Sequence, residues 1–399
     1  MRSPKGSYRT PLKPPGPRRR CAAFAVTVGI LTISTACSSP SSDSSAPSAA
    51  NSSIGVPLAT SVTTPTGTWA TFPMGHLDDP TNTFWEIFTL PAGRQQWAEH
   101  TPPDVADNGG LVIAPTSTGA VVGFRPSQLL SFSPLASTND GGTTYTPGLL
   151  SGGLANVPNA LSVSPSGRAA ALTATQVLAS AALVSAWQPV TTVAAIGALS
   201  AGKACGVQQL TAVMTTDTDV FLGLSCSLPG VVGLLQRAGS TFVSAGVQLP
   251  TADAKDVTEV LRIVQYTQGV AALIGVHDGS TTSYIAAWKS APGSAAWTLS
   301  APQPVDGGLL STGVTSDAGF SVLTKAASGA LSAAVITGPG SSWTELANPP
   351  AGTATISVAA DRSDALVVDS ATFTDYRLTG PQWVKVQTVQ VAIPYGSSG

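Results

Sequence analysis

Short runs of apolar residues, each closed by turn-forming residues, recur through most of the 399-residue chain. Three of them follow one another closely: "VTEVLRIVQY" (257–266), "GVAALIGVHD" (269–278) and "TSYIAAWKS" (282–290). They are rich in Val, Ile and aromatic residues and are bounded by Gly, Pro, Asp and Ser, which is typical of β-strands joined by tight turns. No segment has a sustained helical period. The pattern therefore predicts an all-β fold.

A longer repeat is superimposed on these runs. An aromatic residue follows a turn and precedes a short strand at successive spacings of 40 to 55 residues: Trp97, Tyr145, Trp187, Phe242, Trp297, Trp343 and Trp383. A period in this range is typical of propeller blades, each made of four antiparallel strands. Six sets of strands can be traced from about residue 104 to Trp383, and residues 66–103 supply three more strands. We predict a β-propeller of four-stranded antiparallel blades, with seven blades favoured over six.

The first part of the chain has a different pattern. The first twenty positions hold seven basic residues and no acid, and residues 22–36 form an uncharged apolar run. This run is shorter than the ~20 residues that a membrane-spanning helix needs. The pattern predicts a signal peptide at 1–36. A Ser/Ala/Pro-rich segment follows, so we expect a flexible tether at 37–65 and the propeller domain at 66–399.

The end of the predicted signal, "ISTAC", resembles the lipobox of bacterial lipoproteins. In that family the cysteine, here Cys37, receives the lipid and becomes the new N-terminus. Ser34 departs from the pattern, because an aliphatic residue is usual at that position. The resemblance implies a chain that is anchored to the outer side of the cell membrane by its lipid. An ordinary secreted protein is the alternative.

Charge and cysteine content narrow the possible partners. Charged residues are 10% of the chain, and beyond residue 36 there are 12 basic and 21 acidic residues. A net negative chain is a poor partner for nucleic acid, which requires a basic surface.

Cys205 and Cys226 bracket two strand-like runs around a turn at "TTDTD". A disulfide between them is expected in an oxidising compartment, and two buried thiols are the alternative.

One turn carries a recognisable motif. Thr138, Asp140, Gly142, Thr144 and Tyr145, in "TNDGGTTY", resemble the Asp-box or BNR repeat, although Tyr145 replaces the usual Trp. That motif occurs in sialidases and in many non-enzymatic propellers. The resemblance implies a propeller in which the boxes lie on the rim, away from the ligand. Because an Asp carboxylate can accept hydrogen bonds from a following turn, we expect Asp140 to close the turn and not to bind a ligand.

Two functions from different classes are open. A sialidase-like glycoside hydrolase would need arginines for the substrate carboxylate, and Arg125 in "FRPS" is the nearest match to the first of them. It would also need a tyrosine nucleophile paired with a glutamate. Tyr376 is the obvious late tyrosine, but we expect it on a third strand. We therefore favour a non-catalytic propeller that binds an extracellular protein, peptide or glycan.

The sequence offers little support for a metal or a cofactor. His76, His100 and His277 are isolated, without Cys or His at ligand spacing. His76, Asp78 and Asp79 share the loop "GHLDDPTN", which could hold a cation, but a solvated turn is the preferred interpretation. No strand, Gly-rich loop and helix follow one another as in a nucleotide site. We expect no metal, no cofactor and a monomer.

Overall fold

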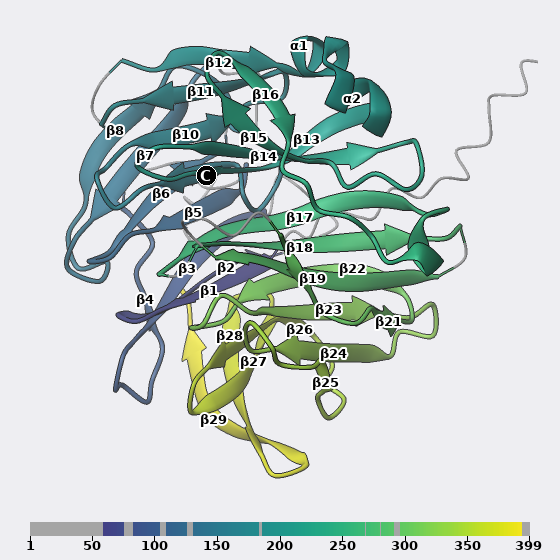
Figure 1. Ribbon diagram of the computed structural model, residues 1–399. Helices are drawn as coiled ribbons and strands as arrows, with labels where there is room; N and C mark the ends of the chain where they lie inside the picture. The colour runs from purple at the N-terminus through teal and green to yellow at the C-terminus, as the bar shows by residue number, and fades with distance from the viewer. Residues whose placement is uncertain are drawn as a thin grey trace, which may run out of the picture. The chain divides into compact units, whose positions relative to one another are not determined.

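The computed structural model describes residues 59–75, 83–103, 109–125, 131–182, 186–267, 269–279, 281–290 and 296–392. All of them belong to one unit, Asn51–Gly399. The fold is all-β, as predicted, and Figure 1 shows its strands running from purple β1 to yellow β29. Within the described ranges, no helix has the length and apolar character needed to cross a membrane. The predicted signal peptide, Cys37, and the tether up to residue 58 lie outside these ranges.

The strands of the described chain form seven consecutive groups of four, and within each group successive strands pair antiparallel. The first three groups are β1 (Ala59–Thr64), β2 (Gly67–Gly75), β3 (Thr83–Pro91) and β4 (Ala98–Glu99); β5 (Leu111–Pro115), β6 (Ala120–Phe124), β7 (Ser133–Thr138) and β8 (Thr146–Leu150); and β9 (Leu161–Val163), β10 (Ala169–Leu172), β11 (Gln176–Ser180) and β12 (Gln188–Thr192).

The next two groups are β13 (Val207–Thr215), β14 (Val220–Cys226), β15 (Leu234–Ala238) and β16 (Thr241–Ser244); and β17 (Val257–Tyr266), β18 (Gly269–His277), β19 (Thr282–Ser290) and β20 (Thr298–Leu299), with β21 (Gln303–Val305) also on β19. The last two are β22 (Gly308–Val314), β23 (Phe320–Lys325), β24 (Leu331–Ile336) and β25 (Thr344–Glu345); and β26 (Thr353–Ala359), β27 (Arg362–Asp369), β28 (Thr372–Thr379) and β29 (Gln382–Gln390).

Buried apolar side chains fill the space between successive groups. Separate clusters join the first group to the second, the fourth to the fifth, the fifth to the sixth and the sixth to the seventh, and one larger cluster spans the second to the fourth. A further cluster joins the last group to the first. Each sheet is thus covered on both faces by its neighbours, which is how a propeller buries small sheets that could not be stable alone. The number of blades stays a prediction, and the seven strand groups are in line with the preferred count.

The first and sixth groups are also joined directly. Strand β1 pairs with β22 in parallel, from Ala59 opposite Ser311 to Val62 opposite Val314. Strand β26 packs against both β1 and β22. The hydroxyls of Ser61 and Ser321 both donate to the carbonyl of Ile356 on β26, at 2.8 and 2.9 Å. The seventh group is therefore held against the sixth and the first by polar contacts as well as apolar ones.

The recurrent aromatics lie between the outer strands of neighbouring groups. Each comes at or just before the fourth strand of its group, and most donate a hydrogen bond to the preceding group. The donors and acceptors are Tyr145 OH to the His100 carbonyl (2.6 Å), Trp187 Nε1 to Leu149 (3.1 Å), Trp297 Nε1 to Ala245 (2.8 Å), Trp343 Nε1 to Ser300 Oγ (3.1 Å) and Trp383 Nε1 to Ala347 (2.9 Å). A large ring with one polar edge can fill such a gap and also find a partner.

At the interface between the last and first groups, a side-chain amide makes the hydrogen bonds to the neighbouring group that the aromatic side chains make elsewhere. Gln387 on β29 accepts from the backbone N–H of Trp97 at 2.8 Å and donates to its carbonyl at 2.9 Å. Beside it, the rings of Phe72, Phe88 and Phe373 stack with centroids 4.1 to 5.6 Å apart. This interface connects residues that are almost 300 positions apart in the sequence.

Two features differ from the expectation. Strand β1, Ala59–Thr64, lies within the range expected for the tether, so the sheet begins before residue 66. The β-branched residues of "ATSVTT" favour a strand, whereas the Ser- and Pro-rich surroundings suggested a linker. Helices α1 (Val193–Ala198) and α2 (Ser200–Cys205) were not expected; Figure 1 places them at the top, beside β12 and β13. Each has only six residues, too few for a helical period to be detected.

Candidate functional site

A cavity with a volume of about 680 Å³ is formed by described residues. It is lined by the ends of β1, β5, β9, β13, β17 and β22, the first strands of six groups, and by the turns that follow them. We call it the inner-strand cavity. Its volume lies within the range of about 300–1,000 Å³ that is typical of small-molecule sites.

The turns at the mouth of the inner-strand cavity are rich in threonine and serine, together with proline, glycine or aspartate. The sequence gives "TTPTG" at 63–67, "PTSTG" at 115–119, "SPSGR" at 164–168, "TTDTD" at 215–219 and "TSDAG" at 315–319. Threonine hydroxyls close these turns: Thr116, Thr216 and Thr315 accept from backbone N–H groups of their own turns at 2.8 to 3.0 Å. Ser and Thr do this locally and leave the chain free to reverse.

Below these turns the cavity wall is mostly neutral. Apolar side chains such as Val163, Met214 and Val314 alternate with hydroxyl and amide side chains such as Ser162 and Asn159. Among the described lining residues the charged side chains are Arg262 on β17 and Asp317 on the turn after β22. Asp317 is exposed, whereas only 1% of Arg262 is exposed. The cavity thus combines a polar mouth with one deeply buried cation.

Arg262 is also poor in partners. Its Nε and Nη1 atoms are buried and make no hydrogen bond to the described residues. Tyr266, further along the same strand and in the same wall, has a buried hydroxyl without a partner. Burial lowers the pKa of the Arg262 guanidinium to about 10, so it keeps its charge at neutral pH. Sequence reasoning missed this residue, although an arginine inside the apolar run "VLRIV" was a usable signal.

The residues of the Asp-box resemblance form a closed turn between β7 and β8. The Asp140 carboxylate accepts from the Thr144 N–H at 3.0 Å, the Thr144 hydroxyl at 2.6 Å and the Thr138 hydroxyl at 2.8 Å. These hydrogen bonds hold the pKa of Asp140 well below its ordinary value. Gly142 has a φ of 98°, and a Cβ there would lie 2.7 Å from the Cβ of His100. None of these residues belongs to the described lining of the inner-strand cavity.

Arg125, the candidate for a sialidase-like substrate arginine, lies elsewhere. Its Nη1 donates to the carbonyl of Gly109 at 2.8 Å and to Asn156 Oδ1 at 2.7 Å. The small cavity beside it has a volume of about 10 Å³, which is too small for a sugar. Pro126 lies outside the described residues, and Tyr376 is on β28, the third strand of its group. Arg125, Arg262 and Tyr376 are therefore not gathered in one cavity.

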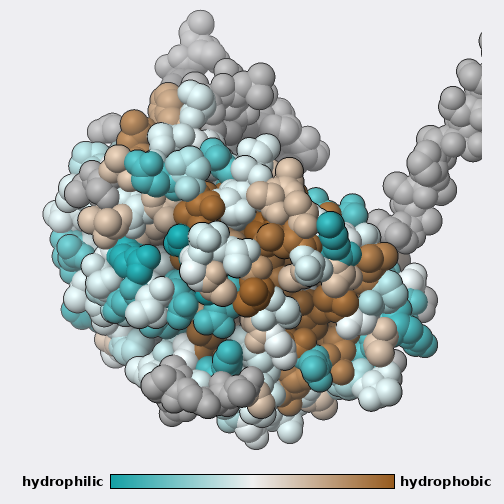
Figure 2. Space-filling view, turned by 45° about the horizontal axis from the view of Figure 1, so that its top comes forward, coloured by the Kyte–Doolittle hydropathy of each residue, from teal (hydrophilic) through white to brown (hydrophobic). Residues whose placement is uncertain are grey.

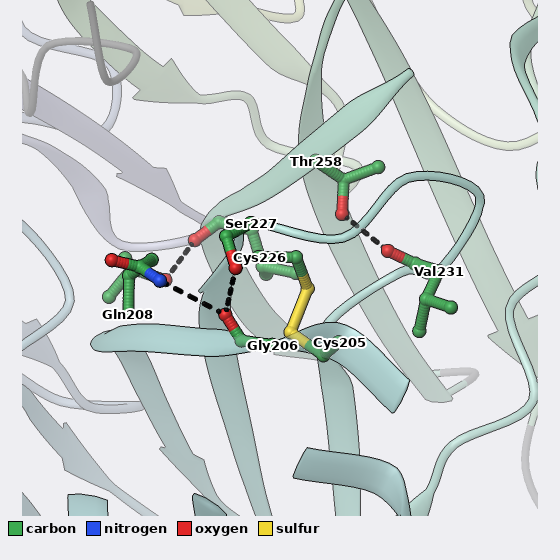
Figure 3. Close-up of a disulfide and its surroundings, with 9 residues drawn as sticks. Cys205, Gly206, Gln208, Cys226, Ser227, Val231 and Thr258 are labelled. Carbon is green, nitrogen blue, oxygen red and sulfur yellow. Dashed lines mark hydrogen bonds between the residues drawn. A yellow bond between two sulfur atoms is a disulfide. The ribbon is translucent and has the colours of Figure 1, made fainter. Parts of the chain in front are cut away.

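The expected disulfide is present between Cys205 and Cys226, whose Cα atoms are 4.8 Å apart. It joins the end of α2 to the end of β14, and Figure 3 shows its surroundings. The hydroxyl of Ser227 and the amide of Gln208 donate to the carbonyl of Gly206, at 2.8 and 3.3 Å. The bridge fixes both ends of the β13–β14 hairpin and contributes no exposed thiol.

Metal ligands are scattered in the part of the chain that is described. No group of three or more His, Cys, Asp or Glu side chains is placed there to hold an ion. His100 Nδ1 is paired with the Thr89 hydroxyl at 2.5 Å, and His277 Nδ1 with the Thr282 hydroxyl at 3.3 Å. The loop that contains His76, Asp78 and Asp79 lies outside the described residues.

Among the described residues, the exposed apolar side chains do not define a second candidate site. Figure 2 shows apolar residues in a band on one face, interrupted and bordered by hydrophilic ones. The large hydrophobic residues that are exposed in the described chain are Phe132, Leu149, Leu228, Val243, Val384 and Val386. Val384 and Val386 share β29, whereas the other four come from separate strands and loops, and scattered apolar residues of this kind are normal on soluble proteins.

No protein-family model matches the chain, and no curated protein sequence matches it. Solved structures do. A xyloglucanase from Xanthomonas campestris is 14% identical, with a TM-score of 0.50 over 84% of this chain. The chain spans 55% of that enzyme's length. A proposed 6-phosphogluconolactonase from Bacteroides fragilis is 8% identical, with a TM-score of 0.52 over 82% of this chain and 96% of its own.

A lectin from Burkholderia pseudomallei is 11% identical, with a TM-score of 0.49 over 85% of this chain and 100% of its own. At such low identity, the likenesses with a TM-score of 0.50 or more speak for the fold alone. They agree with the strand groups in making the chain a β-propeller. Because one fold hosts many functions, the function must be argued from the inner-strand cavity itself.

Proposed function

We propose that the protein is a non-catalytic β-propeller of the Asp-box class that binds a glycan or a peptide in the inner-strand cavity. The observation that carries the proposal is the cavity of about 680 Å³ at the ends of six first strands. Its mouth of threonine and serine hydroxyls suits a ligand with many hydrogen-bonding groups, and its apolar wall suits the nonpolar faces of a sugar ring or a peptide side chain. The hydrogen bonds of Asp140 support the Asp-box assignment.

Binding is favoured over hydrolysis because of the chemistry of the wall. Most glycoside hydrolases need two carboxyl groups beside the scissile bond, and sialidases pair a tyrosine with a glutamate. Among the described lining residues the carboxylate is Asp317, and no glutamate is present. The buried Glu259 lies on β17 but does not line the cavity. A sialidase-like hydrolase is the alternative that the experiment below must exclude.

The test uses a matched pair of substitutions at the cavity mouth. Ser117 lines the inner-strand cavity and is exposed, so Ser117→Trp would fill the mouth without disturbing the core. Thr118 is its exposed neighbour outside the lining, so Thr118→Trp is the control. Ligands found on glycan and peptide arrays should lose binding to Ser117→Trp and keep it to Thr118→Trp. Equal binding to both would place the site elsewhere, and turnover of a fluorogenic sialoside would favour the hydrolase.

We also propose that the protein is exported and anchored by a lipid on Cys37. The basic start, the apolar run at 22–36 and "ISTAC" support the proposal, and the disulfide agrees with an oxidising compartment. Radioactive palmitate should label the wild-type chain and not a Cys37→Ala variant. An unlabelled wild-type chain in the culture medium would favour ordinary secretion.

A further inference from the structure

Arg262 is a buried cation in the wall of the inner-strand cavity, and the described chain does not neutralise it. Its Nε and Nη1 atoms lack hydrogen-bond partners, and none of the ion pairs found involves it. The acid nearest along its strand, Glu259, lies three residues away. The acid of the cavity, Asp317, is exposed on the mouth.

An arginine in this position is energetically unfavourable without a partner. Removing a charge from water costs several kcal/mol in real proteins, and buried charges are therefore normally paired. A guanidinium cannot avoid the cost by losing its proton, since its pKa of about 10 remains well above neutral. The other residues of this wall below the mouth are neutral, for example Ile263 and Val264 next to it. A ligand anion would explain why an arginine occupies this position.

We propose that Arg262 binds an oxyanion, a carboxylate or a phosphate, carried by the ligand of the inner-strand cavity. The inference rests on the proposed function and adds the charge of the ligand to it. The planar guanidinium presents N–H donors that match two oxygens of either group. The Tyr266 hydroxyl, four residues further along the strand in the same wall, also lacks a partner and could donate to another part of the ligand. The remainder of the ligand would face neutral side chains up to the hydroxyl-rich mouth.

The test compares Arg262→Met with Arg168→Met. Methionine has a similar volume and no charge, so removing an unpaired buried charge should not destabilise the ligand-free protein. Arg168 is partly exposed and bonded to the backbone of Asp217, outside the cavity lining. Thermal unfolding of the full-length chain is followed with increasing acetate or inorganic phosphate, against chloride at equal ionic strength. An anion that binds the folded state raises the melting temperature.

We expect a saturable rise for the wild type and for Arg168→Met, and binding at least about tenfold weaker for Arg262→Met. If only acetate or only phosphate raises the melting temperature, the ligand group is a carboxylate or a phosphate, respectively. An equal response of Arg262→Met, or no saturable response of the wild type, would overturn the inference. If Arg262→Met fails to fold, Arg262→Lys takes its place, because lysine keeps the charge but lacks the planar guanidinium. Arg262→Lys should bind the anion more weakly than the wild type. Unchanged binding by Arg262→Lys would also overturn the inference.

The two proposals can fail separately. A neutral array ligand that Ser117→Trp excludes and Arg262→Met binds normally would leave the cavity as the site and refute the anion. The opposite result is also possible. If Ser117→Trp leaves the Arg262-dependent response to acetate or phosphate unchanged, the anion site stands. If both tryptophan variants bind the array ligands equally, the mouth is not the entrance for those ligands.

Discussion

Replacing Asp375 by asparagine should make the protein more stable at high pH and leave it unchanged at low pH. Asp375 on β28 and Asp364 on β27 are both fully buried, between the last strand group and the first. Arg377 donates from Nε to Asp364 at 3.0 Å, and its Nη2 lies 3.8 Å from Asp375. Both oxygens of Asp375 lack a hydrogen bond. Arg377 is thus the ion-pair partner of two buried carboxyl groups, and it forms a hydrogen bond to Asp364 but not to Asp375.

The direction follows from the pKa of Asp375. Burial first, and then repulsion by Asp364, raise it from 3.8 to about 7, while Arg377 and Arg362 oppose the change. Below about pH 4 the group is protonated in both the folded and the unfolded chain and has no effect. Between about pH 4 and 7 the unfolded chain loses the proton first, so the stability falls as the pH rises. At about 1.4 kcal/mol per pH unit, the loss is at most about 4 kcal/mol above pH 7.

Asparagine has the same shape and no charge, so the variant should not show this loss. We therefore expect a gain of about 2 to 4 kcal/mol at pH 8 and none at pH 4. Urea unfolding followed by tryptophan fluorescence at several pH values measures the difference directly. The exposed Asp369→Asn, on the same sheet, is the control and should change little at any pH. A variant less stable than the wild type at pH 8 would show that the charged form of Asp375 is well solvated or paired, and would refute the reasoning.

Three other predictions use the same unfolding assay. Replacing both Cys205 and Cys226 by serine should cost about 3 kcal/mol, because the bridge closes a loop with a sequence separation of 21, and reduction of the wild type should reproduce the loss. Trp297→Phe removes the hydrogen bond to the Ala245 carbonyl and should cost about 1 kcal/mol; no change would mean that packing alone positions the ring. Gly142→Ala should cost more than about 1 kcal/mol, since its φ is 98° and the new Cβ meets His100, whereas alanine at Gly141, which has open space, should suffer only the backbone strain.

The strands were predictable because the pattern that marks them is local. In the fifth group each expected run became one strand, and Trp297, the aromatic expected before the fourth strand, directly precedes β20. The first group was incomplete in the prediction, because β1 lies beside a Ser- and Pro-rich segment and its pairing with β22 joins residues about 250 positions apart. Such a long-range parallel pair leaves no sign in the nearby sequence.

The candidate site was less predictable than the fold. Asp140 has its hydrogen-bond partners within six residues, so its turn can be read from a motif. The inner-strand cavity instead collects the ends of six strands, and no single segment reveals it. Arg125 was preferred because of its neighbours in sequence, but its guanidinium is bonded to Gly109 and Asn156. Arg262 was overlooked because the strand pattern predicts on which face of the sheet a residue lies, but it does not show that this face borders a cavity.

The buried ionisable groups differ in whether they can lose their charge near neutral pH, and this difference bears on the role of Arg262 in the inner-strand cavity. Burial raises the pKa of Glu259 to about 8 and that of Asp375 to about 7, so both carboxyl groups can become neutral near physiological pH by binding a proton. A proton is always available, and these groups need no ligand. Arg262 would have to lose a proton instead, and a pKa of about 10 prevents that. Of these three buried groups, the arginine in the cavity wall therefore keeps a charge that no ion pair of the described residues balances, and this is why we propose that an anion enters through the hydroxyl-rich mouth to pair with it.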